Sequence, residues 1–314
     1  MSLHPQVVAM MQKVAALNLP PNWKVTLQQA RANSRLARTS VELQIEPVHS
    51  VEDRTIPGPA GSIAIRVYRP DDRPGHPLVM LYHGGGWVVG DLDTEDTTCR
   101  GLCNRVNAVV VSVDYRLAPE TVFPGAVKDC YAATLWAVDH AVELGINPSQ
   151  IATSGTSAGG NLSGAVSMVA RDRAFPAIAH QVLFCPIIDC DFDRPSYIKN
   201  GVDYGLTRDS MIWFWDQYTP SSTDRHSPYV SLIRSRDLSG LPDATVIAAE
   251  YDPLLDESVA YAESLTTAGV KTCCTVYEGM THAFNVRTGV LDAAKHALDK
   301  AAAGIRESFA LRST

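Results

Sequence analysis

The stretch that decides the fold is Ile151-Ala152-Thr153-Ser154-Gly155-Thr156-Ser157-Ala158-Gly159-Gly160. Its first four residues are typical of a buried strand, and a helical pattern begins directly after the glycines. A G-x-S-x-G string between a strand and a helix is typical of a nucleophile elbow, a tight turn that exposes a serine hydroxyl above a sheet. Side chains at Gly155 and Gly159 would collide with neighbouring strands in such a turn. We therefore predict Ser157 as a nucleophile, with a glycine-rich structural turn as the alternative.

Strands and helices alternate on both sides of this stretch. Several of the expected strands are continuous apolar runs, as in strands that are buried on both faces of a parallel sheet. The expected strands are 77–83, 108–113, 150–154, 180–184, 245–250 and 271–277. The expected helices are 94–106, 125–143, 158–172, 254–267 and 290–310. This order predicts the α/β class, with a mostly parallel central sheet flanked by helices.

The N-terminal part of the chain does not follow this alternation. Apolar residues recur at helical spacing, Pro20-Pro21 separates two helices, and Thr26 with Gln29 forms a capping box for the second. Residues 48–69 alternate around Pro57-Gly58-Pro59, a pattern that predicts a hairpin of two strands.

A second irregular segment lies between Phe184 and Thr245. It contains about 60 residues, which is too long for an ordinary loop, and it is rich in aromatic residues. Those rings either bind an apolar part of a ligand or form the core of a lid. We predict one core with a two-part cap: N-terminal cap helices in 1–45, core in 46–186 and 231–314, and a cap insertion in 187–230.

Composition excludes several classes of protein. The chain has 314 residues, 46% of them hydrophobic, and its 27 Lys+Arg against 34 Asp+Glu leave a net charge of −7. That charge does not attract nucleic acid or an anionic membrane surface. No apolar run approaches the ~20 residues of a membrane span, and the first residues do not resemble a secretion signal. We therefore expect a cytoplasmic protein without a membrane span.

The seven cysteines do not form a metal-binding pattern. Their number is odd, and no CxxC pair is matched by a second CxxC or by a histidine pair. We expect buried free thiols.

A second glycine-rich motif, His83-Gly84-Gly85-Gly86, follows the strand expected at 77–83. Bare glycines let backbone N–H groups approach a developing oxyanion, and this loop supplies part of the oxyanion hole in hydrolases with a nucleophile elbow. A phosphate cradle is the competing interpretation, but the chain has neither a G-x-G-x-x-G string nor a Gly-Lys dipeptide. We expect His83 to shape the loop through a backbone hydrogen bond.

The expected general base is His282, because it follows the strand at 271–277 where catalytic groups gather in open α/β sheets. It also satisfies the chain order Ser, acid, His. The other histidines after Ser157 lie in an inner strand, in the insertion and on a helix surface: His180, His226 and His296.

The expected acid is Asp252, at the end of the strand before His282, where it would orient the imidazole. Glu250 and Asp256 are the alternatives. Asp256 and Glu257 lie about a turn further on and would favourably charge the start of the next helix.

Together these motifs resemble the hormone-sensitive-lipase-like carboxylesterases, bacterial family IV. The residues that carry the resemblance are His83 to Trp87, Asp114 to Glu120, Gly155 to Gly160, Tyr251 to Leu254 and His282 to Phe284. The resemblance implies an α/β-hydrolase fold with a helical cap, in which Gly85, Gly86 and Ala158 donate to the oxyanion. It also implies that residues 114–120 support the site, with their arginine and acids paired to one another. Thr156 stands where most members carry Asp, and Ala283 where Gly is usual, and a GTSAGG branch does occur.

The function implied is a serine carboxylesterase for short to medium acyl chains that needs neither metal nor cofactor. The expected partner is a small-molecule ester, and the resemblance suggests a homodimer. Two alternatives remain from the residues alone: an amide or peptide hydrolase with the same triad, and a non-catalytic small-molecule receptor.

Overall fold

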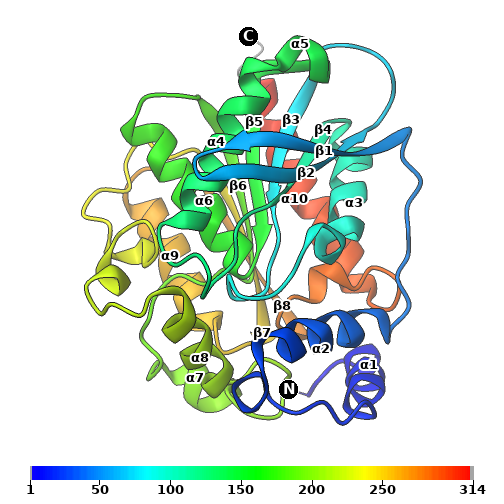
Figure 1. Ribbon diagram of the computed structural model, residues 1–314, viewed down its shortest axis with the longest axis vertical. Coiled ribbons are helices and arrows are strands. Elements are labelled where there is room, and N and C mark those ends of the chain that lie inside the picture. The colour runs from blue at the N-terminus through cyan, green and yellow to red at the C-terminus, as the bar shows by residue number, and fades with distance from the viewer. Residues whose placement is uncertain (1, 312–314) are drawn as a thin grey trace.

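The computed structural model describes residues 2–311 and contains an eight-stranded sheet between two layers of helices (Figure 1). The strand order is β1-β2-β4-β3-β5-β6-β7-β8. The hairpin of β1 and β2 is antiparallel and joins β4 in an antiparallel pair, whereas all other neighbours are parallel. The predicted α/β class with a mostly parallel sheet is therefore confirmed.

The elements agree closely with those expected. The strands are β1 (Ser50–Gly58), β2 (Gly61–Arg69), β3 (His76–Tyr82), β4 (Val109–Asp114), β5 (Ile146–Thr156), β6 (Ile178–Phe184), β7 (Asp243–Tyr251) and β8 (Thr272–Thr281). The helices are α1 (Pro5–Ala15), α2 (Leu27–Thr39), α3 (Asp96–Val106), α4 (Gly125–Asp139), α5 (Ala141–Leu144), α6 (Ala158–Asp172), α7 (Pro195–Asn200), α8 (Arg208–Tyr218), α9 (Leu255–Thr267) and α10 (Asp292–Ala310). The helix expected over 125–143 is divided at His140, and the hairpin turns at residues 59–60, just after the expected position.

The apolar runs form the inner strands because helices cover both faces of the sheet. Every residue of β6 is buried, and β3 and β4 are almost as deeply enclosed. On one face, Leu162 of α6 and Tyr261 of α9 belong to one apolar cluster, while Leu102 of α3 and Leu298 of α10 belong to the cluster on the other face.

The irregular segments lie together at one end of the sheet. In Figure 1, α1 and α2 are found at the lower end of the molecule, near α7 and α8 of the insertion. The Thr26 hydroxyl accepts a hydrogen bond from the Gln29 N–H at 3.2 Å, as the capping pattern predicts. Arg31 ties α2 to the core through a bidentate pair with Glu120 at 2.8 Å. The termini of the insertion meet at Asn161, whose amide donates to the carbonyls of residues 187 and 230.

Two expectations about side chains are wrong. The charged residues of 114–120 do not pair with one another: Arg116 pairs with Asp129 of α4 at 2.7 Å, and Glu120 pairs with Arg31 of α2. The segment is an irregular loop, so these two side chains reach neighbouring helices. The thiols are all free, but Cys273 and Cys274 are exposed, because β8 is an edge strand.

None of the helices within residues 2–311 combines the length and the apolar character that crossing a bilayer requires.

Candidate active site

Ser157 lies at the sharp turn between β5 and α6. Its backbone has φ 59° and ψ −117°, a strained conformation for a residue with a side chain. A Cβ on Gly155 would lie 2.2 Å from the carbonyl oxygen of Gly159, and a Cβ on Gly159 would lie 1.9 Å from that of Tyr82 in β3. The turn therefore requires both glycines, as the sequence predicts.

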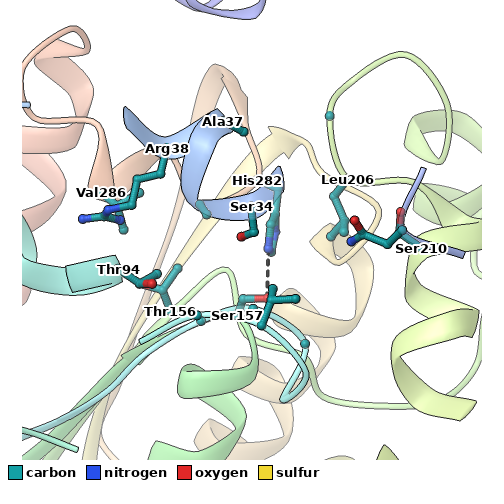
Figure 2. Close-up of a pocket in the computed structure, with 18 of the residues that line it drawn as sticks. Ser34, Ala37, Arg38, Thr94, Thr156, Ser157, Leu206, Ser210, His282 and Val286 are labelled. Carbon is teal, nitrogen blue, oxygen red and sulfur yellow. Dashed lines mark hydrogen bonds between the residues drawn. The ribbon is translucent and has the colours of Figure 1, made fainter. Parts of the chain in front are cut away.

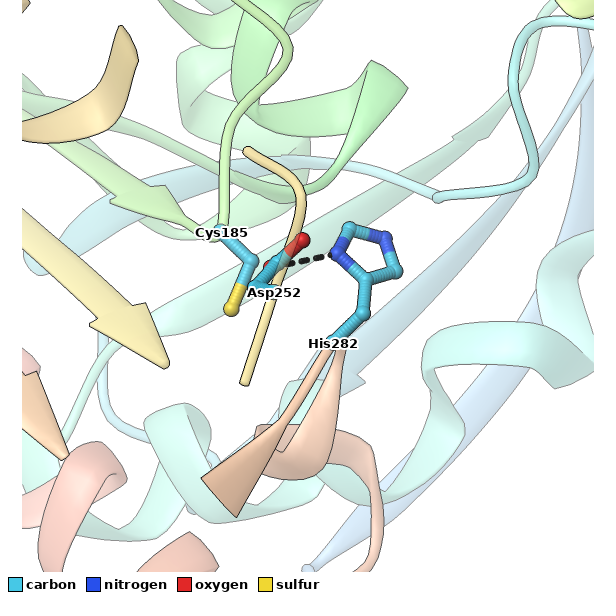
Figure 3. Close-up of side chains that lie close together, drawn as sticks. All are labelled: Cys185, Asp252 and His282. Atoms are coloured by element: carbon cyan, nitrogen blue, oxygen red, sulfur yellow. Dashed lines mark hydrogen bonds and ion pairs between the residues drawn. The ribbon is translucent and has the colours of Figure 1, made fainter. Parts of the chain in front are cut away.

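Three of the predicted side chains meet at the carboxyl ends of the strands. The Ser157 hydroxyl is 2.9 Å from His282 Nε2, and His282 Nδ1 is 2.7 Å from Asp252 Oδ2 (Figures 2 and 3). Asp252 is only 1% exposed, and its other oxygen accepts the Leu254 N–H at 2.9 Å. Because the buried carboxylate accepts from Nδ1, Nε2 is left to accept the serine proton.

The alternative acids are engaged elsewhere. Glu250 accepts the N–H of Gly279 at 2.8 Å, and Asp256 accepts the N–H of Ser196 at 2.7 Å. Neither carboxylate contacts His282, so Asp252 is the acid that the fold brings to the imidazole.

The other histidines have structural surroundings. His180 is buried in β6, where its two nitrogens contact the hydroxyls of Ser308 and Thr245, each at 2.9 Å. His296 is exposed on α10 and His226 belongs to the insertion. None of these three rings contacts Ser157.

Asn200 supports the acid, and sequence reasoning did not identify it. This buried residue ends α7, and its amide donates to the main-chain carbonyls of Glu250 at 3.0 Å and of Asp252 at 3.1 Å. The insertion thus holds the loop that carries Asp252. No local pattern around Asn200 signals this contact across about fifty residues.

Cys185 is the third group near Asp252 and His282, and the potential ligand atoms of the three lie within 4.8 Å of one another (Figure 3). Burial raises the pKa of the Cys185 thiol well above its ordinary value, so the thiol stays protonated. A protonated thiol is a poor metal ligand. The trio therefore fits a catalytic pair with a neighbouring neutral thiol better than a metal site.

The loop after β3 presents unpaired N–H groups beside Ser157. Gly85 and Gly86 have φ +119° and +59°, and a Cβ on Gly86 would lie 2.2 Å from the Phe214 ring. Within residues 2–311, the N–H groups of both glycines have no hydrogen-bond acceptor. Ala158 begins α6, and the first N–H groups of a helix have no partner inside it. Among the described residues, the N–H groups of all three predicted donors therefore have no acceptor, and they lie in the loop after β3 and at the start of α6.

His83 shapes this loop, as predicted. Its ring stacks on Tyr115 with centroids 4.2 Å apart, and its Nδ1 donates to the Gly84 carbonyl at 2.8 Å. The Tyr115 hydroxyl donates to the His83 carbonyl at 2.8 Å. Burial lowers the pKa of His83, which favours the neutral ring.

A cavity of about 380 Å³ opens above Ser157. In Figure 2, Leu206 and Ser210 lie on one side of the serine, and Arg38 and Thr156 lie on the other.

Most of the rings of the insertion pack into the apolar cluster that they share with the core. Trp215 and Tyr218 are fully buried against Trp87, with the Trp87 and Tyr218 rings stacked 4.4 Å apart. Phe214 lines the cavity next to Gly86. Most of this aromatic segment is therefore engaged in packing and not in lining the cavity.

Thr156, at the position where the family resemblance leads us to expect Asp, makes a side-chain hydrogen bond. Its hydroxyl accepts from the Asn285 amide at 2.7 Å. The fully buried carboxyl of Glu95 lies close by and lines the same cavity. Burial raises the pKa of Glu95 above its ordinary value. The sequence pattern did not single out Glu95, because nothing in its local context distinguishes it from a surface acid.

Comparisons with known proteins agree with this geometry. The model of a family described as having the alpha/beta hydrolase fold matches residues 79–286. A carboxylic ester hydrolase, LipN of Mycobacterium tuberculosis, is 43% identical over 74% of this chain and 64% of its own length. An arylesterase of Saccharolobus solfataricus is 39% identical over 90% of this chain and 92% of its own. A solved hyperthermophilic esterase of Pyrobaculum calidifontis superposes with a TM-score of 0.91 at 40% identity, covering 98% of this chain and 99% of that one.

Proposed function

The chain belongs to the alpha/beta hydrolase fold family, in its hormone-sensitive-lipase-like branch, and is a carboxylesterase; we propose that Ser157, His282 and Asp252 are its catalytic triad. The observation that carries this proposal is the continuous path of hydrogen bonds from the serine hydroxyl through both imidazole nitrogens to a buried carboxylate. Serine, base and acid each come from a loop at the carboxyl edge of the sheet.

In the proposed mechanism, Ser157 Oγ attacks the ester carbonyl carbon while His282 Nε2 accepts the hydroxyl proton. Collapse of the tetrahedral intermediate breaks the bond to the alcohol oxygen, which takes the proton from His282. A water molecule then attacks the acyl-enzyme and gives a proton to His282. Collapse of this second tetrahedral intermediate breaks the bond to Ser157 Oγ, which takes the proton back from His282, and the acid is released. Asp252 keeps its charge throughout and stabilises the imidazolium.

We assign the oxyanion hole to the N–H groups of Gly85, Gly86 and Ala158. Loss of one such donor typically costs about 3–4 kcal/mol of transition-state stabilisation. Their free N–H groups and the positive φ of both glycines support this assignment.

We expect substrates with short to medium acyl chains. A cavity of about 380 Å³ is near the lower end of the 300–1,000 Å³ range of small-molecule sites. A series of nitrophenyl esters from acetate to palmitate tests this expectation: kcat/KM should peak below about eight carbons.

The cap is proposed to consist of residues 1–45 and the insertion 187–230 acting together over the site. Lining residues from both segments, Arg38 and Phe214 among them, support this organisation. The cytoplasmic location and the homodimer stay predictions, to be tested by cell fractionation and by sedimentation.

Pre-steady-state kinetics with a nitrophenyl ester test the triad. Wild type should release a burst of nitrophenol as the serine is acylated, and Ser157→Ala should show neither burst nor turnover. A wild type that binds a small ester without hydrolysing any member of the series would instead support the receptor alternative. Faster cleavage of matched anilides than of esters would support the amide hydrolase.

A further inference from the structure

The side of the cavity near Arg38 carries charge, whereas the opposite side does not. We call this side the cationic end, and its members are Arg38, Glu95, Thr156 and Arg287. Figure 2 shows Arg38 extending from α2 above Thr156, away from Leu206 and Ser210. The cationic end therefore begins next to the nucleophile and includes α2.

Arg38 is a buried charge without a close ion pair, and the carboxyl groups of Glu95 and Asp91 attract it only from beyond ion-pair distance. It is only 9% exposed, and within residues 2–311 its Nη2 has no hydrogen-bond partner and no carboxylate oxygen lies within 4.0 Å of its guanidinium nitrogens. Buried charges in proteins are normally paired because desolvation is costly. A guanidinium that lines a cavity and has no close ion pair can bind an anion there.

Arg287 adds a second positive charge. Its Nη1 donates to the main-chain carbonyl of Arg38 at 3.0 Å, which also caps the last turn of α2. Burial and the charge of Arg38 lower the pKa of Arg287 to about 10, so its guanidinium remains charged at neutral pH. Burial also lowers the pKa of Arg38, but an arginine guanidinium stays protonated in proteins. Because the two positive charges repel each other, the binding of an anion between them becomes more favourable.

Glu95 makes no close ion pair with this charge. It is fully buried, no guanidinium nitrogen lies within 4.0 Å of its carboxylate among residues 2–311, and the side chains of Thr98 and Thr156 lie beside it. Burial raises the pKa of Glu95, while the charge of Arg38 acts in the opposite direction. The acids of the neighbouring 91–96 segment pair with other arginines: Asp91 with Arg35, Asp93 with Arg66, and Asp96 with Arg100.

We propose that the cationic end binds a carboxylate carried by the substrate, so that this enzyme prefers esters with a second, ionised carboxyl group. This inference rests on the carboxylesterase function above and specifies its substrate class. A carboxylate matches the planar fork of a guanidinium, with two parallel N–H···O bonds. The anion is carried by either the acyl or the alcohol part of the ester, and the two cases share this recognition chemistry.

Paired substrates test the proposal at pH 7.5 in a pH-stat. Monoethyl adipate is compared with ethyl hexanoate for an acyl-side carboxylate, and 4-acetoxybutanoate with pentyl acetate for an alcohol-side carboxylate. In at least one of the two pairs, wild type should hydrolyse the charged ester with a kcat/KM at least tenfold higher than that of the neutral ester. Arg38→Gln should lower that charged-to-neutral ratio at least tenfold and Arg38→Lys by less, because lysine keeps the charge but not the fork.

Arg35→Gln is the matched control. Arg35 lies one turn earlier on α2 and also lines the cavity, but it is 68% exposed and is already paired with Asp91. Its loss should leave the charged-to-neutral ratio within about twofold of wild type. If Arg38→Gln does not fold, Arg287→Gln takes its place with the same expected fall in the ratio.

The proposal is overturned if wild type prefers the neutral ester in both pairs, or if the ratio is the same in Arg38→Gln and wild type. Failure to hydrolyse any neutral ester would contradict the proposed function instead. Calorimetric binding of monoethyl adipate to Ser157→Ala separates the two: binding at least tenfold tighter than in Ser157→Ala/Arg38→Gln supports the cationic end without catalysis, and equal binding contradicts it.

Discussion

The amide of Asn200, at the end of α7, donates to the main-chain carbonyl of Asp252 at 3.1 Å. The same amide donates to the carbonyl of Glu250. One side chain of the insertion therefore fixes the backbone on both sides of Tyr251, the residue before the acid. The orientation of His282 therefore depends on a residue outside the sheet that carries the triad.

Asn200→Ala should lower kcat about tenfold with little change in KM, because the acid loop loses its support while the cavity keeps its lining. Loss of the two buried hydrogen bonds should also cost about 1–3 kcal/mol of unfolding free energy, although the Asp252 carbonyl keeps its hydrogen bond from the Leu255 N–H. Steady-state kinetics and urea denaturation measure both effects. Asn147→Ala, at the start of β5, where the side chain bonds to Ser149 and Gln150 and not to the acid loop, is the control. A rise in KM at unchanged kcat would assign Asn200 to substrate binding instead.

Asp252→Asn should lower kcat by a factor of about 10⁴, because the amide no longer holds the imidazole in the productive tautomer. Asp256→Asn should stay within a few fold of wild type, since Asp256 contacts only the start of α7. Measuring ester turnover by the two purified variants shows which aspartate is the acid of the triad. A larger loss at Asp256 would overturn the assignment of the acid.

Gly159→Ala should destabilise the protein by more than about 3 kcal/mol, since its Cβ would lie 1.9 Å from the backbone of β3, which has no room to move. Gly240 has a φ of +69°, which strains a residue with a side chain, but its added Cβ would meet only the flexible side chain of Arg171. Gly240→Ala should therefore lower the free energy of unfolding by about 1 kcal/mol. Chemical denaturation compares the two. A Gly159→Ala protein as stable as wild type would contradict the steric account of the elbow.

Stability should fall as the pH decreases from 6.5 towards 3, in part because of His180. Burial lowers the pKa of His180 to about 3, so in this range the unfolded chain binds a proton that the folded protein does not. One such group contributes a slope of about 1.4 kcal/mol per pH unit. In urea titrations at pH values across this range, the free energy of unfolding of His180→Gln should fall less steeply with decreasing pH than that of wild type. Parallel curves would mean that His180 carries a proton in the folded protein.

Much of the fold and of the candidate site could be predicted because their signals are local. Continuous apolar runs such as β3 indicate buried strands, and the turn at Ser157 and the loop at Gly85 are recognised from glycines that backbone contacts require. Asp252 and His282 follow from chain order, since the carboxyl ends of parallel strands meet at one edge.

The remaining features depend on contacts between distant segments. Arg116 and Glu120 pair with helices rather than with each other, because an irregular loop gives no periodicity from which a partner can be inferred. Arg38 and Glu95 look like surface charges in sequence, and only the tertiary packing at one end of the sheet buries them. The exposure of Cys273 follows from the edge position of β8, which strand order alone determines.

The hydrogen bond between Arg287 and the carbonyl of Arg38 joins a helix to a loop that is made 249 residues later. A growing chain that has emerged as far as α9 contains Ser157 and Asp252 but neither His282 nor the residue that closes α2 over the cavity. A nascent polypeptide therefore lacks the general base of the proposed triad until residue 282 has been made, and it lacks the contact that closes α2 until residue 287 has been made.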